Sequence, residues 1–265
     1  MIPVQRVAVT ERLARLCHNR TEKIRELGAT SKAAGDEWGR AEAAKSEIRA
    51  LLERMAPGVQ RCMYCLDNMG TDIDHFEPKS RAPLRTFCWH NHLLACSRCN
   101  SNFKREEYPC DEETGECLLI DPSTDDPANH LELLLALGEY EGKTRKGEES
   151  IRVFGLNRED LVLGRLDAYI TSCDVLNSWH RKVKNGDLAG AAQSATALRR
   201  EPFGDVLRAL ETLGRLPYAT AALGDELAES LSVWLRTPQP DAAAGRPHTV
   251  PPSRSASPDH RRVGP

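Results

Sequence analysis

The chain has 265 residues, 40% of them hydrophobic, and a formal net charge of -3. This length supports one substantial core or two small domains, and the small net charge excludes a polycation that binds nucleic acid by charge alone. No apolar run approaches the roughly 18–20 residues of a membrane span, and residues 1–12 lack the apolar core of a signal peptide, so we expect a cytoplasmic protein.

Residues 10–56 have helical patterning, which begins behind Thr10 as a predicted N-cap. The stretch 37–55 is rich in Ala, Glu, Lys and Arg, and Pro57 and Gly58 then interrupt the pattern. The charges are mixed rather than basic, so we interpret residues 1–57 as a two-helix support and not as an arm that grips DNA.

Four of the nine cysteines form two CxxC pairs with thirty residues between them: Cys62 with Cys65, and Cys96 with Cys99. Each pair can direct two thiolates at one tetrahedral ion, and four thiolates leave no open position for water. The pattern therefore predicts structural zinc. Redox activity is a weaker interpretation, because neither pair follows a strand in a βαβ context, and four incidental buried cysteines are weaker still.

The stretch between and just after the two pairs carries groups suited to metal-assisted cleavage of phosphodiesters. That chemistry needs a hard cation, a general base and positive charge near the phosphate. Asp74 and Asn100 offer oxygen ligands for Mg²⁺ or Mn²⁺, and the adjacent His75 is expected to titrate near neutrality. The side chains available for phosphate contact are Lys79, Lys104 and Arg105.

The rest of the chain is predicted to be mostly helical. Short strands are expected at 118–122 and 150–154, with a charged turn region over 140–149. A long helix is expected to start at Asn157 as N-cap, with Asp160 in its first turn. Further helices are predicted over 129–137, 188–199, 204–213 and 223–236.

The fold class expected is therefore α+β and mostly helical, with a small metal-stapled module between helical segments. The predicted units are an N-terminal helical arm (1–57), the zinc-stapled module (58–122), a helical C-terminal region (123–236) and a tail (237–265). The tail is rich in Pro, Ala, Ser, Arg and Gly, a composition that predicts disorder.

The central motifs resemble the HNH endonuclease family. The resemblance is carried by Asp74-His75 after a hydrophobic strand, by Asn91, and by Asn100 directly after the second CxxC pair. Longer stretches are similar to the HNH nucleases of Septu-type and retron-associated anti-phage systems: 62–65, 73–80, 89–91, 95–104, 119–127 and 155–158. The similarity covers about residues 58–175, and His92 departs from it, because leucine is expected there.

The resemblance implies a ββα-metal module in which Asp74 and Asn100 bind the catalytic metal and His75 activates the attacking water. Asn91 then braces the loop that bears the base through backbone hydrogen bonds. Asn100 in place of a histidine favours an oxygen-loving ion over zinc. The resemblance also implies a DNA substrate and a partner ATPase that gates cutting, since the sequence has no GxxxxGK[ST] motif of its own.

Two other functions stay open. One is a non-catalytic zinc module that binds nucleic acid or protein, and the other is an RNA-cleaving toxin. The joint presence of Asp74, His75 and Asn100 favours the enzyme over the binding module. Cys110 and Cys117 lack CxxC spacing and receive no role, although they offer ligands for a second ion.

Overall fold

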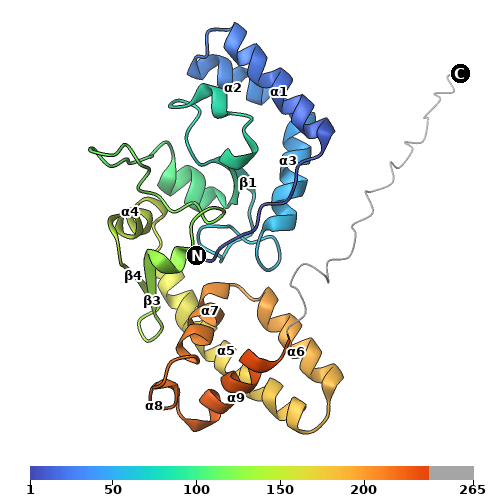
Figure 1. Ribbon diagram of the computed structural model, residues 1–265, viewed down its shortest axis with the longest axis vertical. Coiled ribbons are helices and arrows are strands. Elements are labelled where there is room, and N and C mark those ends of the chain that lie inside the picture. Colours follow the sequence, from blue (N-terminus) through green and yellow to red (C-terminus); the bar gives the residue numbers. More distant parts are fainter. Residues whose placement is uncertain (239–265) are drawn as a thin grey trace, which may run out of the picture.

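A computed structural model describes residues 1–238 of the chain, which form a mostly helical α+β protein with two small two-stranded sheets. Figure 1 shows the N-terminal helices at one end of the molecule and the C-terminal helices at the other, with the strands between them. Within residues 1–238, every helix is either too short or too polar to cross a bilayer.

The N-terminal arm contains three helices rather than the predicted two: α1 (Glu11–Glu26), α2 (Ser31–Gly39) and α3 (Glu42–Met55). Thr10 is the N-cap of α1, as predicted, and its side chain accepts a hydrogen bond from Leu13 N at 3.1 Å. The stretch 37–55 is not one helix, because α2 ends on Gly39, and glycine is among the weakest helix formers.

An antiparallel hairpin and a helical segment form the centre of the molecule. Strand β1 (Asp72–His75) pairs with β2 (His92–Ala95), and the segment η3 (Arg98–Lys104), a π-helical turn, follows directly. The resemblance placed Asp74 and His75 after a strand. In the structure they are the last two residues of strand β1 itself. All four residues of β2 are buried, and α3 contacts both strands.

Four predictions for residues 118–154 were wrong. The expected turn region 140–149 is divided between strand β4 (Glu139–Gly142) and helix α4 (Arg145–Phe154). Residues 118–122 form no strand. The expected helix 129–137 instead contains strand β3 (Leu131–Leu134), which pairs with β4 and is followed by a turn. Gly138, at a φ of 69°, closes this hairpin, so the short apolar run is extended rather than helical. Residues 150–154 belong to α4 (Arg145–Phe154), which Thr144 caps by accepting from Gly147 N at 3.2 Å.

Five helices form the C-terminal region: α5 (Glu159–Lys184), α6 (Leu188–Arg200), α7 (Gly204–Leu213), α8 (Ala219–Leu223) and α9 (Asp225–Arg236). The predicted helices 188–199 and 204–213 are confirmed, whereas 223–236 is divided at Gly224. The N-cap of α5 is Arg158, not Asn157, but Asp160 does lie in its first turn. Residues 239–265 of the predicted tail lie outside the described residues.

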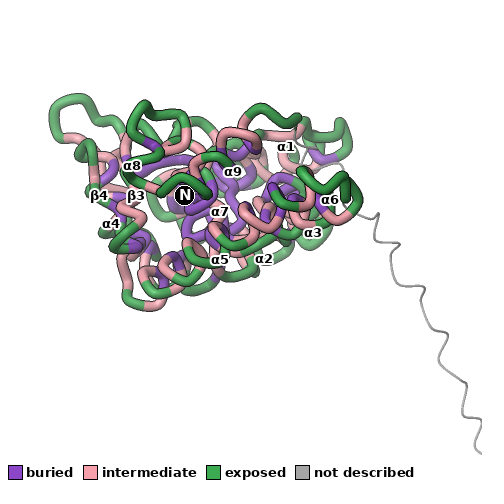
Figure 2. The backbone as a smooth tube through the Cα atoms, turned by 90° about the horizontal axis from the view of Figure 1, so that it is seen from below, coloured by how far each residue is buried: buried purple, intermediate pink, exposed green. Residues whose placement is uncertain are grey.

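One cluster of buried hydrophobic side chains runs through the described chain, from Met1 in the N-terminal segment to Trp234 in α9. Figure 2 shows its buried stretches inside the molecule and the exposed stretches around the outside. The central hairpin packs within this cluster, so neighbouring elements on both sides fix its position.

Candidate metal centre and active site

The four CxxC cysteines meet in one buried cluster. Cys62 and Cys65 come from the loop after α3, while Cys96 and Cys99 come from the end of β2 and the start of η3. Their sulfur atoms all lie within 4.8 Å of one another, and Cys65 Sγ is 3.9 Å from Cys96 Sγ. Sulfurs bound at about 2.3 Å to a tetrahedral ion lie about 3.8 Å apart, so the spacing fits zinc.

The electrostatics of the cluster also favour a cation. Burial raises the pKa of the Cys62 thiol well above its ordinary value, because a thiolate loses its hydration there. Four buried sulfurs this close cannot all ionise without a compensating positive charge, and a divalent ion supplies it. The Met63 N–H, inside the first CxxC pair, donates to Leu94 O at 2.9 Å and so attaches this pair to β2.

Asp74 is buried and bonded to two side chains. Lys104 Nζ donates to Asp74 Oδ1 at 3.1 Å and to the His75 carbonyl at 2.9 Å, and both the Lys104 and the Asp74 side chains are almost wholly buried. Tyr64 Oη donates to the other carboxylate oxygen at 2.5 Å. Burial raises the pKa of Tyr64 well above its ordinary value, so its hydroxyl stays a donor. The charge of Asp74 is thus balanced from within the protein.

His75 and His92 share one backbone acceptor. Their Nε2 atoms lie 3.0 Å and 2.9 Å from the carbonyl oxygen of Thr86. A carbonyl only accepts, so both rings carry their proton on Nε2, and Nδ1 of His75 is left as an acceptor facing Lys79 Nζ at 3.4 Å. His92, whose place the sequence did not decide, is fully buried beside this site.

The expectation that His75 titrates near neutrality was wrong for this environment. Burial first, and then the neighbouring His92 and Lys79, lower the pKa of His75 to about 2. The imidazole is therefore neutral at physiological pH, as a general base must be. Its low pKa also makes it a weak proton acceptor.

Asn91 spans the loop between the two strands. Its Oδ1 accepts from Glu77 N at 2.8 Å, and its Nδ2 donates to the carbonyls of Glu77 and Arg85 at 3.0 Å and 3.2 Å. Asn100 is placed differently, because its Nδ2 donates to Asp72 Oδ2 at 3.2 Å. The amide of Asn100 therefore contacts Asp72, and not Asp74, in this arrangement.

The three predicted phosphate-contacting cations occupy different environments. Lys79 is half-buried beside His75, while Arg105 is exposed, with its Nε donating to Asn102 O at 3.1 Å. Lys104 is buried against Asp74, so it reaches an external phosphate only if that ion pair breaks. The candidate active site does not line either of two open pockets, of about 410 and 590 Å³, that lie elsewhere on the described residues.

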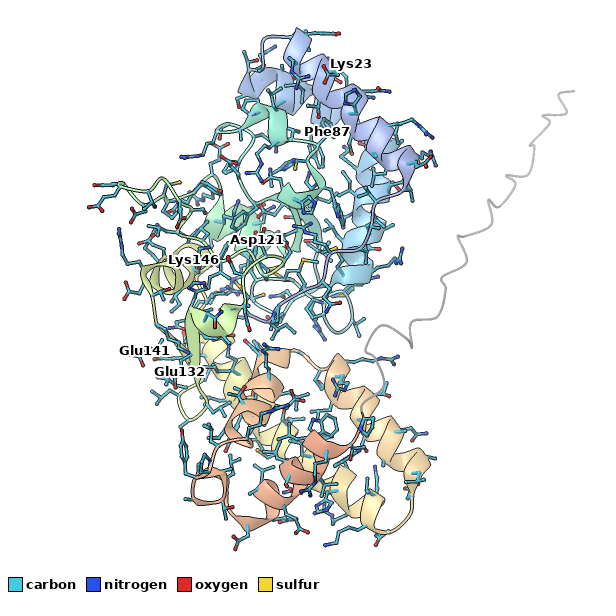
Figure 3. All side chains as sticks on the ribbon, viewed as in Figure 1. Lys23, Phe87, Asp121, Glu132, Glu141 and Lys146 are labelled. Carbon is cyan, nitrogen blue, oxygen red and sulfur yellow. The ribbon has the colours of Figure 1, made fainter. Side chains whose placement is uncertain are left out.

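The N-terminal arm contributes a cover to this site. The ring of Trp38, in α2, meets His75 edge to face at 4.4 Å between centroids and stacks on His92 at 5.4 Å. Trp38 also lies 5.4 Å from Phe87, which Figure 3 shows beside the N-terminal helices. His75 is only 6% exposed, with Trp38 packed on one side of its ring and Lys79 Nζ near Nδ1.

Sequence reasoning missed several residues that shape the site. Trp38, Tyr64 and Thr86 are described above. Arg6 donates to the Trp89 and His92 carbonyls, and Arg158 donates to Cys99 Sγ. Tyr64 lies inside the first CxxC pair. Arg158 lies inside 155–158, one of the stretches that are similar to the Septu-type nucleases, so local motifs include both residues. Arg6 and Trp38 lie far away in the sequence, where no local pattern marks them.

Together these features define a mostly helical α+β protein whose central hairpin is clasped by a four-cysteine cluster suited to zinc. Among curated proteins, the chain is similar to the Septu protein PtuB of Bacillus mycoides (strain KBAB4), with 32% identity over 150 residues. The match covers 45% of this chain, which spans about half the length of that relative. It agrees with the resemblance to Septu-type proteins expected from the motifs. No family model matches the sequence, and no solved structure matches it.

Proposed function

We propose that this protein is a metal-dependent endonuclease of the HNH type that hydrolyses DNA phosphodiesters in anti-phage defence, gated by a partner ATPase. The observation that carries the proposal is that one hairpin and the helix after it hold Asp74, His75, Asn91 and Asn100, with the cysteine cluster beside them. The similarity to a Septu protein supports the defence context.

In this proposal His75 is the general base. The Thr86 carbonyl holds the Nε2 proton and so fixes the tautomer in which Nδ1 is the acceptor. Lys79 Nζ faces Nδ1, so Nδ1 takes a proton from water only when Lys79 makes room for that water. Lys79, 3.4 Å from Nδ1, places positive charge where the scissile phosphate has to approach. Asn91 fixes the loop between the strands, so the imidazole is held in one orientation.

The catalytic cation fits this arrangement less well than zinc fits the cysteines. Lys104 and Tyr64 donate hydrogen bonds to both oxygens of the Asp74 carboxylate, and the Asn100 side chain donates to Asp72. Among residues 1–238, the cysteine cluster is the group of His, Cys, Asp or Glu side chains arranged for a metal. A hard cation at Asp74 and Asn100 therefore requires these contacts to rearrange, and we assign no reaction step to it.

The test is cleavage of supercoiled plasmid DNA and of a structured RNA, each with Mg²⁺, Mn²⁺ or EDTA, and with and without the products of neighbouring genes. We expect metal-dependent DNA cleavage that His75→Ala lowers by about 10²–10⁴-fold, the usual contribution of a general base. His90→Ala is the matched control, because His90 is exposed near the same hairpin. Equal activity of the His75→Ala and wild-type proteins would refute the assigned base, and cleavage of RNA alone would redirect the proposal to an RNA-cleaving toxin.

A non-catalytic zinc module that binds nucleic acid or protein is the second candidate. Two observations favour it: Asp74 is neutralised by Lys104, and His75 is covered by Trp38. Absence of cleavage under every condition, together with salt-dependent binding to DNA, would support this candidate over the nuclease.

A further inference from the structure

The side chain of Arg158 contacts the cysteine cluster. The residue precedes α5, in the turn after α4, and its side chain is 7% exposed. Its Nη1 lies 3.6 Å from Cys99 Sγ, within hydrogen-bonding distance of a sulfur acceptor. Its Nη2 is buried without a hydrogen-bond partner, so part of the guanidinium charge is not compensated by hydrogen bonds within the protein.

The charge of a tetrathiolate site explains what a buried guanidinium does there. Four thiolates around one divalent ion carry a net charge of about -2, and burying that charge is costly unless a cation lies close. An N–H donor to a metal-bound sulfur also draws negative charge from it and favours the bound thiolate over the free thiol. Arg158 is placed to do both.

The turn that carries Arg158 is fixed by packing on both sides. Gly155 has a φ of 58°, and a Cβ added there would lie 2.3 Å from the ring of Phe103 in η3. Leu156 is fully buried, and the Asn157 side chain bonds both backbone groups of Tyr140, at 2.8 Å and 2.7 Å. Residues 155–158 thus join α4, β4 and η3 at the point where Arg158 meets Cys99.

We propose that Arg158 is a positioning residue of the cysteine metal site, which stabilises the bound tetrathiolate by donating to Cys99 Sγ and joins the C-terminal helices to that site. The ligand class is a thiophilic divalent cation such as Zn²⁺. The proposal rests on metal binding by the four cysteines and is independent of nuclease activity, so failure of the cleavage assay leaves it unaffected.

A purely structural role is the competing explanation. Arg158 Nη1 also donates to the carbonyls of Phe154 and Gly155, at 3.3 Å and 3.2 Å, and its Nε donates to Asp160 at 3.2 Å. A residue that only closes this turn would affect thermal stability and leave metal retention unchanged. The rate of metal loss separates the two explanations.

The experiment measures zinc per chain and the rate of zinc transfer to an excess of a chromogenic chelator in the full-length protein. We expect Arg158→Met to release zinc about 10–100-fold faster than wild type, the usual effect of losing a hydrogen bond to a metal ligand. Arg158→Lys, which keeps the charge but not the planar donor, is expected to lie between them.

Arg98→Met is the matched control. Arg98 lies next to Cys99 in η3, and its Nη1 contacts Asp160 at 2.9 Å, so this change breaks the neighbouring ion pair and spares the contact with sulfur. We expect wild-type release from it. Wild-type release from folded Arg158→Met, equal acceleration by Arg98→Met, or a wild-type chain without bound zinc would each overturn the proposal. Where Arg158→Met does not fold, Arg158→Lys decides: faster release supports the proposal and wild-type release overturns it.

Discussion

The ion pair between Asp74 and Lys104 dominates the candidate active site at the scale of single residues. Both side chains are almost completely buried, and Tyr64 satisfies the second carboxylate oxygen. Burying two charges costs desolvation free energy, and the attraction between the two charges offsets that cost. Removing one partner leaves the other as an uncompensated charge in the interior.

We therefore expect Asp74→Ala to lower the free energy of unfolding by about 3–5 kcal/mol, as for other broken buried pairs. The double variant Asp74→Ala with Lys104→Met should recover most of that loss, because no charge is left buried. Chemical denaturation of the three proteins measures both effects. The control is Asp72→Ala on the same strand, where the half-buried carboxylate accepts one bond from Asn100 at 3.2 Å and one from Ser101 at 3.5 Å. A loss as large for Asp72→Ala would contradict the assigned role of the pair.

At the scale of elements, the loop between β1 and β2 depends on Asn91. This buried side chain makes three hydrogen bonds to backbone groups of the loop, so it replaces the regular ladder where the strands separate. We expect Asn91→Ala to cost about 2–4 kcal/mol of stability, because those backbone groups lose their partners. A melting temperature like that of the exposed control Asn102→Ala would show that water replaces the amide.

The cysteine cluster links two other elements, the loop after α3 and the start of η3. Structural zinc binds such sites with about 10–16 kcal/mol in small peptides, a magnitude that no local apolar contact replaces. We expect Cys62→Ser to lose zinc and the cooperative unfolding transition. Cys17→Ser, in α1 and outside the cluster, should keep both. Metal analysis and thermal melting provide the readouts, and a Cys62→Ser protein with full zinc content would disprove the tetrathiolate site.

At the scale of the whole molecule, residues distant in sequence complete the central module. Arg6 Nη1 donates to the carbonyls of Trp89 and His92, at 2.9 Å and 2.7 Å, and Trp38 covers His75. Arg158 contacts the cysteine cluster from the C-terminal side. The module thus shares its core with both flanking regions.

A fragment of residues 58–122 is therefore expected to bind zinc without acquiring a cooperative unfolding transition, because its buried faces lose the cover of α2, α3 and α4. Calorimetry of the zinc-loaded fragment beside residues 1–238 measures this. A sharp transition in the fragment would mean that the module folds by itself and does not need the flanking contacts for its stability.

Features that depend on local spacing could be predicted from the sequence. The two CxxC pairs predicted the cysteine cluster, Thr10 predicted the start of the first helix, and the helices 188–199 and 204–213 followed from their apolar periodicity. Short apolar runs such as 129–137 failed, because a few residues fit a strand as well as a helix, and the turn at Gly138 decided between them.

The environments of the individual groups could not be predicted from the sequence. Three features depend on how the elements pack: Lys104 binds Asp74, His75 and His92 share the Thr86 carbonyl, and Trp38 and Arg158 reach the site from distant segments. Burial and neighbouring charge set the pKa of His75, and neither can be read from residue order, because both are properties of the space around the ring.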